Sequence, residues 1–432
     1  MTERSRAVPS SGQADVLLTG VTGFLGQELL CQLLTDTAAR VTCLIRASND
    51  AKAERRLRET VERLFGAESW ALVSSRVVAA RGDVTERGMG MSRRTRAGLV
   101  RSTTHLIHCA ATVRFDLPLA AARRINVGGT MEVGDFTARA HREGRLEGAV
   151  FVSTSFVGGR HPELFGEDDL DVGQEFRNTY EQSKFEAELV IRPLMRDVPV
   201  IVVRPSIVIG HSRSGATNAF NVIYWPLRIY ADRSLGVAPA QADLPVDIVP
   251  VDFVARSTIA ALFEGEPGTT YALAAGEHAT RAGTIGDVAA RVFDVRPPVF
   301  ITRSLERAVV PILWPLTFIG PWRRVGRSLR QFLPYFRYGS RFDTRNADAL
   351  LRPRGIEPPP STELLEPALV FARSTDFGRD TDAVQRSADR LARQRRRALT
   401  RSAPRQRAIR RAPRPAPSGT ARPRGRARAP TR

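Results

Sequence analysis

Lysine is almost missing from this chain of 432 residues, because only Lys52 and Lys184 occur among its 65 basic side chains. Lys184 follows Tyr180 by four residues. In a helix this spacing places both side chains on one face. A compact ammonium beside a phenol lowers the phenol's pKa and gives a proton donor that works near neutral pH. Arginine could hold a charge there, but it is a wider, planar donor that points in a different direction.

Cysteine and histidine are also scarce. The three cysteines are Cys31, Cys43 and Cys109, an odd number in apolar surroundings, which favours buried thiols in a reducing compartment over a disulfide framework. The six histidines form no pattern with metal-ligand spacing, so the sequence implies no metal site.

Long hydrophobic runs are absent as well. The first dozen residues are polar and contain no apolar signal-peptide segment, so we expect a cytoplasmic protein. The apolar stretch Val309–Trp322 contains three prolines and is too short to span a bilayer. We interpret it as a buried or lid element, with a peripheral membrane contact or an acyl-chain entrance as the alternative.

The positive charge gathers at the C-terminal end. Residues 386–432 contain 17 arginines and one acid, so about +4 of the total net charge of +20 remains for residues 1–385. This arginine-, alanine- and proline-rich segment has few large apolar residues, and we expect residues 376–432 to be disordered. We favour a solvated extension; attraction to acidic lipids is an alternative, and nucleic-acid binding is disfavoured by the lack of aromatic residues.

A glycine-rich turn lies near the N-terminus. The apolar run Val16–Thr19 is followed by Gly20, Gly23 and Gly26, and Gln27–Leu34 then has the pattern of a helix. Strand, glycine turn and helix in this order are typical of a dinucleotide-binding fold, in which the turn allows a pyrophosphate to approach the helix N-terminus.

The remaining pattern alternates between strands and helices, which predicts an α/β fold with a doubly wound parallel sheet. The expected helices are Gly23–Thr35, Ala51–Leu64, Leu119–Arg142 and Thr179–Arg192. The expected strands are Asp15–Thr19, Arg40–Ile45, Val77–Arg81, His105–Cys109, Gly148–Ser153 and Val200–Val203.

These motifs resemble the extended short-chain dehydrogenase/reductases, and within them the thioester-reducing branch of fatty acyl-CoA reductases and synthetase reductase domains. Besides the glycine turn and Tyr180-x-x-x-Lys184, the resemblance rests on Gly82-Asp83-Val84, His108-Cys109-Ala110-Ala111, Asn126-Val127-x-Gly129-Thr130 and Val203-Arg204-Pro205-Ser206. It covers about residues 14–275 and implies a nucleotide-binding domain there. We expect residues 1–13 to be disordered and residues 276–375 to form a smaller, mostly helical substrate module.

The resemblance implies a nicotinamide cofactor. Its expected binding residues are Gly20, Thr22, Gly23, Phe24, Leu25, Gly26, Arg46, Asp83, Val84, Ala110, Ala111, Tyr180, Lys184 and Pro205. Arg46 ends the second strand, where NAD-dependent enzymes carry an acid. Because arginine attracts a 2′-phosphate, we predict NADPH. For Asp83, a turn-forming or capping carboxylate is the alternative.

The resemblance also implies a catalytic set of Thr154, Tyr180 and Lys184, with Asn126 behind it. Ser153 and Ser155 flank Thr154 and are not excluded as the catalytic hydroxyl. For Asn126 a structural role in its helix is an equal alternative.

The expected reaction is reduction of a fatty acyl thioester, carried by coenzyme A or a carrier protein, to an aldehyde or further to an alcohol. One alternative is a nucleotide-sugar epimerase or dehydratase, or a hydroxysteroid-type dehydrogenase, of the same fold. Another is a nonenzymatic protein that senses nucleotides or binds nucleic acid through the basic C-terminal segment. Acyl chain length and oligomeric state stay open.

Overall fold

The computed structural model describes residues 14–220, 223–232, 236–238, 240–300, 335 and 339–411, with side chains up to residue 401. The expectations for residues 1–13 and for the apolar stretch Val309–Trp322 lie outside the described residues.

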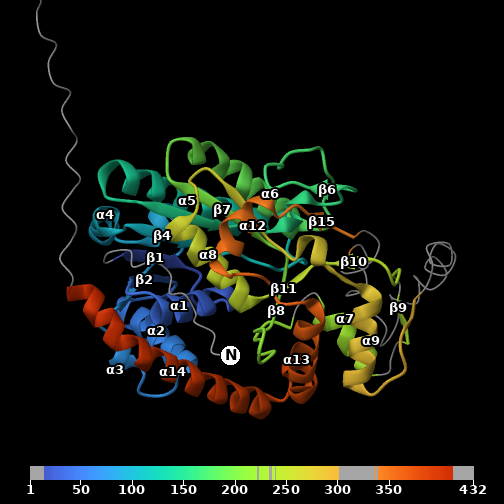
Figure 1. Cartoon of the computed structure of the whole chain (residues 1–432). Coiled ribbons are helices and arrows are strands. Elements are labelled where there is room, and N and C mark those ends of the chain that lie inside the picture. Colours follow the sequence, from blue (N-terminus) through green and yellow to red (C-terminus); the bar gives the residue numbers. More distant parts are fainter. Residues whose placement is uncertain are drawn as a thin grey trace, which may run out of the picture.

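A parallel sheet of seven strands forms the centre of the protein, in the order β12-β7-β5-β4-β1-β2-β3 (Figure 1). Its strands are β1 (Asp15–Thr19), β2 (Arg40–Ile45), β3 (Val77–Arg81), β4 (His105–His108), β5 (Gly148–Val152), β7 (Val200–Pro205) and β12 (Thr270–Leu273). The predicted doubly wound α/β fold is confirmed, and six of the strands were expected from the sequence. The seventh, β12, lies at the edge of the sheet beside β7.

Helices cover both faces of the sheet. One core packs residues of α1 (Phe24–Asp36), α2 (Asp50–Phe65) and α8 (Val251–Glu264) against one face. A second core packs residues of α4 (Arg93–Ser102), α5 (Leu119–Glu143) and α6 (Thr179–Ile191) against the other. In β1, Val16 and Leu18 enter the first core and Leu17 the second, as the alternation of side chains along a strand requires.

The sheet reverses its strand order between β1 and β4. Successive strands β1, β2 and β3 extend to one side of this point, and β4, β5, β7 and β12 extend to the other. In open sheets of this kind, ligands bind beyond the carboxyl ends of the strands at the point of reversal. The fold therefore places the glycine turn after β1 at the expected binding crevice.

A separate hydrophobic core lies beside the sheet. It packs residues of α7 (Tyr224–Ala231), α9 (Ala282–Phe293) and α13 (Ser361–Ser374) with the short strands β8 (Ile207–Ile209) and β11 (Ile248–Pro250). Its residues come from both sides of position 276, and the boundaries of the predicted domains stay a prediction.

Short elements complete the described chain. The helices are α3 (Trp70–Val73) and α12 (Arg345–Leu351), and the paired two-residue strands are β6 (Leu164–Phe165) with β15 (Arg341–Phe342), β9 (Val237–Ala238) with β14 (Val299–Phe300), and β10 (Pro245–Val246) with β13 (Thr280–Arg281).

The C-terminal helix α14 (Thr381–Arg411) corrects one expectation. Disorder was expected from residue 376 onward, but this helix runs along α1 and α2 at the lower edge of the protein (Figure 1). Ala392 and Leu399 are buried there, and Arg395 forms an ion pair with Glu28 of α1. The surface of α1 and α2 thus supplies the apolar contacts that the segment lacks on its own.

Candidate active site

The glycine turn lies directly against the end of β4. Gly20 has a φ of +80°, and a Cβ atom there would lie 2.6 Å from the backbone nitrogen of Ala110. A Cβ atom on Gly26 would lie 2.1 Å from the carbonyl oxygen of Gly20. Neither position accepts a larger residue, so the close approach of turn, strand and helix depends on these two glycines.

The first turn of α1 is open to an anion. No side chain caps its N-terminus at Gly23, and Thr22 and Gly23 are exposed while Phe24 and Leu25 are partly exposed. Free backbone N–H groups at a helix N-terminus bind phosphate readily. This cradle fits the pyrophosphate of a dinucleotide.

Arg46 and Asp83 lie at the ends of β2 and β3. The Arg46 side chain is 78% exposed, and its guanidinium lies 3.9 Å from the Asp83 carboxylate. Asp83 Oδ1 also accepts hydrogen bonds from the backbone N–H and the hydroxyl of Thr85, so it shapes the turn, as the alternative reading held. Val84 is buried against Gly129, whereas Ala111 is exposed after β4.

Tyr180 and Lys184 lie in the first two turns of α6, and Thr154 follows β5. The Thr154 hydroxyl hydrogen-bonds the Tyr180 phenol and also donates to the carbonyl oxygen of Pro205 at 3.3 Å. The Lys184 ammonium donates to the carbonyl oxygen of Val152 at 2.9 Å. The structure therefore joins Thr154 and Tyr180 by a hydrogen bond and places the Lys184 ammonium at the end of β5, two residues before Thr154 in the chain.

The expected acidification of the phenol is wrong for this arrangement. Burial raises the pKa of Tyr180 to about 12, and the Thr154 hydrogen bond offsets only part of that increase. The ammonium of Lys184 is directed to a backbone carbonyl, and burial lowers its own pKa to about 8. The sequence argument counted the charge of Lys184 but not the loss of water around both groups.

The two serines beside Thr154 have other surroundings. The Ser155 hydroxyl is buried and donates to the carbonyl oxygen of Arg204 at 2.7 Å. Ser153 is buried and lines a small cavity with Lys184 and Glu188. Of these three side-chain hydroxyls, the one of Thr154 hydrogen-bonds the Tyr180 phenol.

Asn126 joins the loop after β4 to the helix that carries Tyr180. Its side chain accepts from the backbone N–H of Thr112 at 2.8 Å and donates to the hydroxyl of Ser183 at 2.9 Å. Ser183 in turn donates to the carbonyl oxygen of Tyr180 at 3.0 Å. Asn126 therefore positions the start of α6.

Sequence reasoning missed a polar and aromatic cluster beside Tyr180. Tyr335 donates to the Glu181 carboxylate at 2.6 Å and its ring stacks on Phe115 at 5.8 Å. Phe115 lies 5.6 Å from the Tyr180 ring, and Arg177 forms an ion pair with Glu181 at 3.2 Å. Tyr335 is more than 150 residues from Glu181 in the chain, so no local pattern could have revealed the contact.

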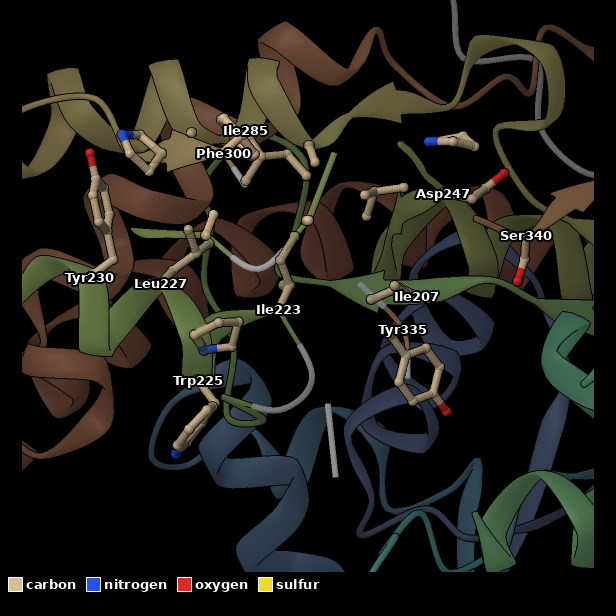
Figure 2. Close-up of a pocket in the computed structure, with 18 of the residues that line it drawn as sticks. Ile207, Ile223, Trp225, Leu227, Tyr230, Asp247, Ile285, Phe300, Tyr335 and Ser340 are labelled. Atoms are coloured by element: carbon tan, nitrogen blue, oxygen red, sulfur yellow. The ribbon is translucent and has the colours of Figure 1, made fainter. Parts of the chain in front are cut away.

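An apolar pocket adjoins this cluster (Figure 2). Tyr335 and Phe156 line it together with residues from α7, α9 and the strands around them. Trp225 and Tyr230 of α7 form part of its wall.

Within the described residues, no cluster of three histidine, cysteine or acidic side chains could hold a metal ion. The same part of the chain contains no helix long and apolar enough to cross a membrane.

Three features define an extended short-chain dehydrogenase/reductase. They are a parallel sheet whose strand order reverses at β1 and β4, the glycine turn after β1, and the residues Thr154, Tyr180 and Lys184. The family model described as male sterility protein matches residues 18–258, and the chain belongs to this NAD-binding family. It is thus an NAD(P)-dependent oxidoreductase of the thioester-reductase branch, as the motifs predicted.

Three relatives illustrate the similarity. Glycine betaine reductase ATRR of Emericella nidulans is 34% identical over 56% of this chain and 19% of its own length. Fatty acyl-CoA reductase wat of Drosophila melanogaster is 28% identical over 58% of this chain and 54% of its own. The chain thus matches less than two thirds of either relative. The terminal R domain from the myxalamid PKS-NRPS biosynthetic pathway is 26% identical, with a TM-score of 0.71 over 86% of this chain and 94% of that one.

Proposed function

We propose that this protein uses NADPH to reduce a fatty acyl thioester, carried by coenzyme A or by a carrier protein, to an aldehyde. The observation that carries the proposal is the hydrogen bond between Thr154 and Tyr180, with the Lys184 ammonium held at the carbonyl oxygen of Val152 at the end of β5 and an apolar pocket nearby. Membership in a family with reductase relatives supports it. The free cysteines are compatible with the cytoplasmic location that we also propose.

In the proposed reduction, the cofactor and each of the residues Tyr180, Thr154 and Lys184 have a separate role. The cofactor, when bound along Gly20–Gly26, supplies a hydride. Tyr180 and Thr154 donate hydrogen bonds to the thioester oxygen as it gains negative charge, an oxyanion-hole role. Tyr180 then gives its proton to that oxygen. The ammonium of Lys184, which donates to the carbonyl oxygen of Val152 in this structure, is the positive charge that we assign to offset the phenolate that remains. The resulting hemithioacetal separates into an aldehyde and a free thiol; a second reduction of the aldehyde would give an alcohol.

The preference for NADPH rests on Arg46. Its guanidinium is exposed at the end of β2, where a ribose 2′-phosphate would lie, and its one ion pair among the described residues is the long one to Asp83. Arg46→Ala should weaken NADPH binding about tenfold or more and leave NADH binding nearly unchanged. Equal losses for both cofactors would contradict the assignment.

The function is tested by following NADPH oxidation with acyl-CoA and acyl-carrier thioesters and by trapping the aldehyde. Tyr180→Phe, which keeps the ring and removes the proton, should lower the rate by about 10²- to 10⁴-fold. Its affinity for NADPH, measured by fluorescence, should stay close to that of the unmodified protein. Turnover of a nucleotide sugar without oxidation of NADPH by any thioester would overturn the proposal.

A further inference from the structure

The apolar pocket has a defined composition. Its volume is about 160 Å³, and among the lining residues that the structure describes only Asp247 belongs to a charged type. Both carboxylate oxygens of Asp247 are engaged, since they accept hydrogen bonds from the backbone N–H groups of Ala275 and Gly276 at 2.9 Å each. No described side chain offers a free charge to a ligand here, so the pocket suits an uncharged apolar group.

The pocket also has a direction. At one end Tyr335 stacks on Phe115, which in turn contacts the ring of Tyr180. At the other end Tyr230 of α7 is buried and donates its hydroxyl to the carbonyl oxygen of Arg296. Ile223 lies between these two tyrosines (Figure 2). A group that enters beside Tyr180 and extends along the pocket would therefore meet Tyr230 last.

We propose that this pocket holds a compact, uncharged acyl group and that Tyr230 sets its maximum length. The inference rests on the proposed thioester reduction and deepens it by naming the class of acyl group. A cavity of roughly 150 Å³ accommodates a ligand the size of benzene, so a pocket of this volume has room for about six non-hydrogen atoms. This size points to a short or medium acyl group, and the described part of the lining offers no free charge to pair with a charged aminoacyl group.

Binding can be measured without turnover, because Trp225 lines the pocket and reports on it by fluorescence. We would titrate the full-length protein with straight-chain primary alcohols from butanol to dodecanol. Each added methylene should tighten binding about fourfold until the chain reaches Tyr230, after which the affinity should stop rising. Trp225→Phe identifies the signal, and 6-aminohexan-1-ol should bind at least tenfold more weakly than hexan-1-ol.

Two variants should change, in opposite directions, the chain length at which the affinity for alcohols stops rising. Tyr230→Ala removes the ring at the far end and should shift the plateau to longer alcohols, whereas Tyr230→Phe keeps the ring and should leave the plateau in place. Ile223→Trp fills the middle of the pocket and should shift the plateau to shorter alcohols. If Tyr230→Ala does not fold, as judged by circular dichroism, Ile223→Trp still carries the test.

The outcomes separate this inference from the proposed function. A chain-length series without a plateau, or a plateau that neither Tyr230→Ala nor Ile223→Trp moves, overturns the inference even if thioesters are reduced. Absence of thioester reduction with a movable plateau overturns the proposed reaction and leaves the pocket assignment standing.

Discussion

Lys184 carries its charge inside the protein, where burial lowers its pKa to about 8 and the nearby Glu188 carboxylate offsets part of that effect. Glu188 itself is held by a buried ion pair with Arg204 at 2.6 Å. The pKa of the Glu188 carboxyl stays below its ordinary value despite burial, because Arg204 favours the charged form. The charge on Lys184 is therefore sensitive to pH in a range that experiments can reach.

This sensitivity predicts the pH dependence of cofactor use. The ammonium is present below pH 8 and is lost as the pH rises through about 8, whereas Tyr180, with a pKa near 12, keeps its proton. The value of kcat/KM for NADPH reports the free enzyme and should fall above about pH 8. Lys184→Arg should be slower but free of this decline, because guanidinium stays charged. A flat profile up to pH 10 in the unmodified protein would contradict the assignment.

Thr154 allows a second test at the scale of single residues. Its hydroxyl contacts the Tyr180 phenol, while Ser155 donates to a backbone carbonyl. Thr154→Val keeps the shape and removes the donor, so kcat with a thioester should fall about 10²-fold. Thr154→Ser should retain most of the activity. Comparable losses in both variants would indicate that packing, and not the hydroxyl, matters at this position.

Individual elements are joined around the active site by buried polar contacts. Glu167, from the insertion between β5 and α6, accepts hydrogen bonds from the backbone N–H groups of Ala272, Asn346 and Ala347. These donors belong to the edge strand β12 and the first turn of α12. One carboxylate thus satisfies a helix N-terminus and ties the insertion to the sheet.

Replacing this carboxylate by an amide should destabilise the protein. In Glu167→Gln, an amide nitrogen would face a backbone N–H, so at least one buried donor would lose its partner. The free energy of unfolding should fall by about 1–3 kcal/mol, as measured by chemical denaturation. Glu163→Gln is the matched control, because Glu163 is exposed four residues earlier in the same insertion. Equal stability of the two variants would contradict the proposed role of Glu167.

Elements whose signals are local could be predicted from the sequence. The glycine turn and the spacing of Tyr180 and Lys184 depend on neighbouring residues, and the structure has them where the motifs indicate. The contacts of Tyr335 with Glu181 and of Glu167 with Asn346 join residues more than 150 positions apart. No periodicity carries such information, so the aromatic end of the pocket could not be anticipated.

At the scale of the whole molecule, α14 near the end of the described chain packs against α1 and α2 near its beginning. Its arginine-rich composition suggested disorder, yet Ala392 and Leu399 are seven residues apart and thus lie on one face of the helix. That face is buried against α1 and α2, while Arg393 and Arg397 are exposed. The composition alone did not reveal this amphipathic pattern, because much of the buried face consists of alanines and not of large apolar residues.

The contact of α14 predicts that residues far from the active site stabilise the nucleotide-binding half. Leu399 is 4% exposed and belongs to the core formed with α1 and α2. Leu399→Ala should lower the free energy of unfolding by about 2–4 kcal/mol, whereas Arg397→Ala, two residues away on the exposed face, should change it by about 0.5 kcal/mol or less. Denaturation monitored by circular dichroism provides the comparison. If Leu399→Ala were as stable as Arg397→Ala, α14 would not pack on α1 and α2 in solution, and the first half of the sheet would be stable without the C-terminal helix.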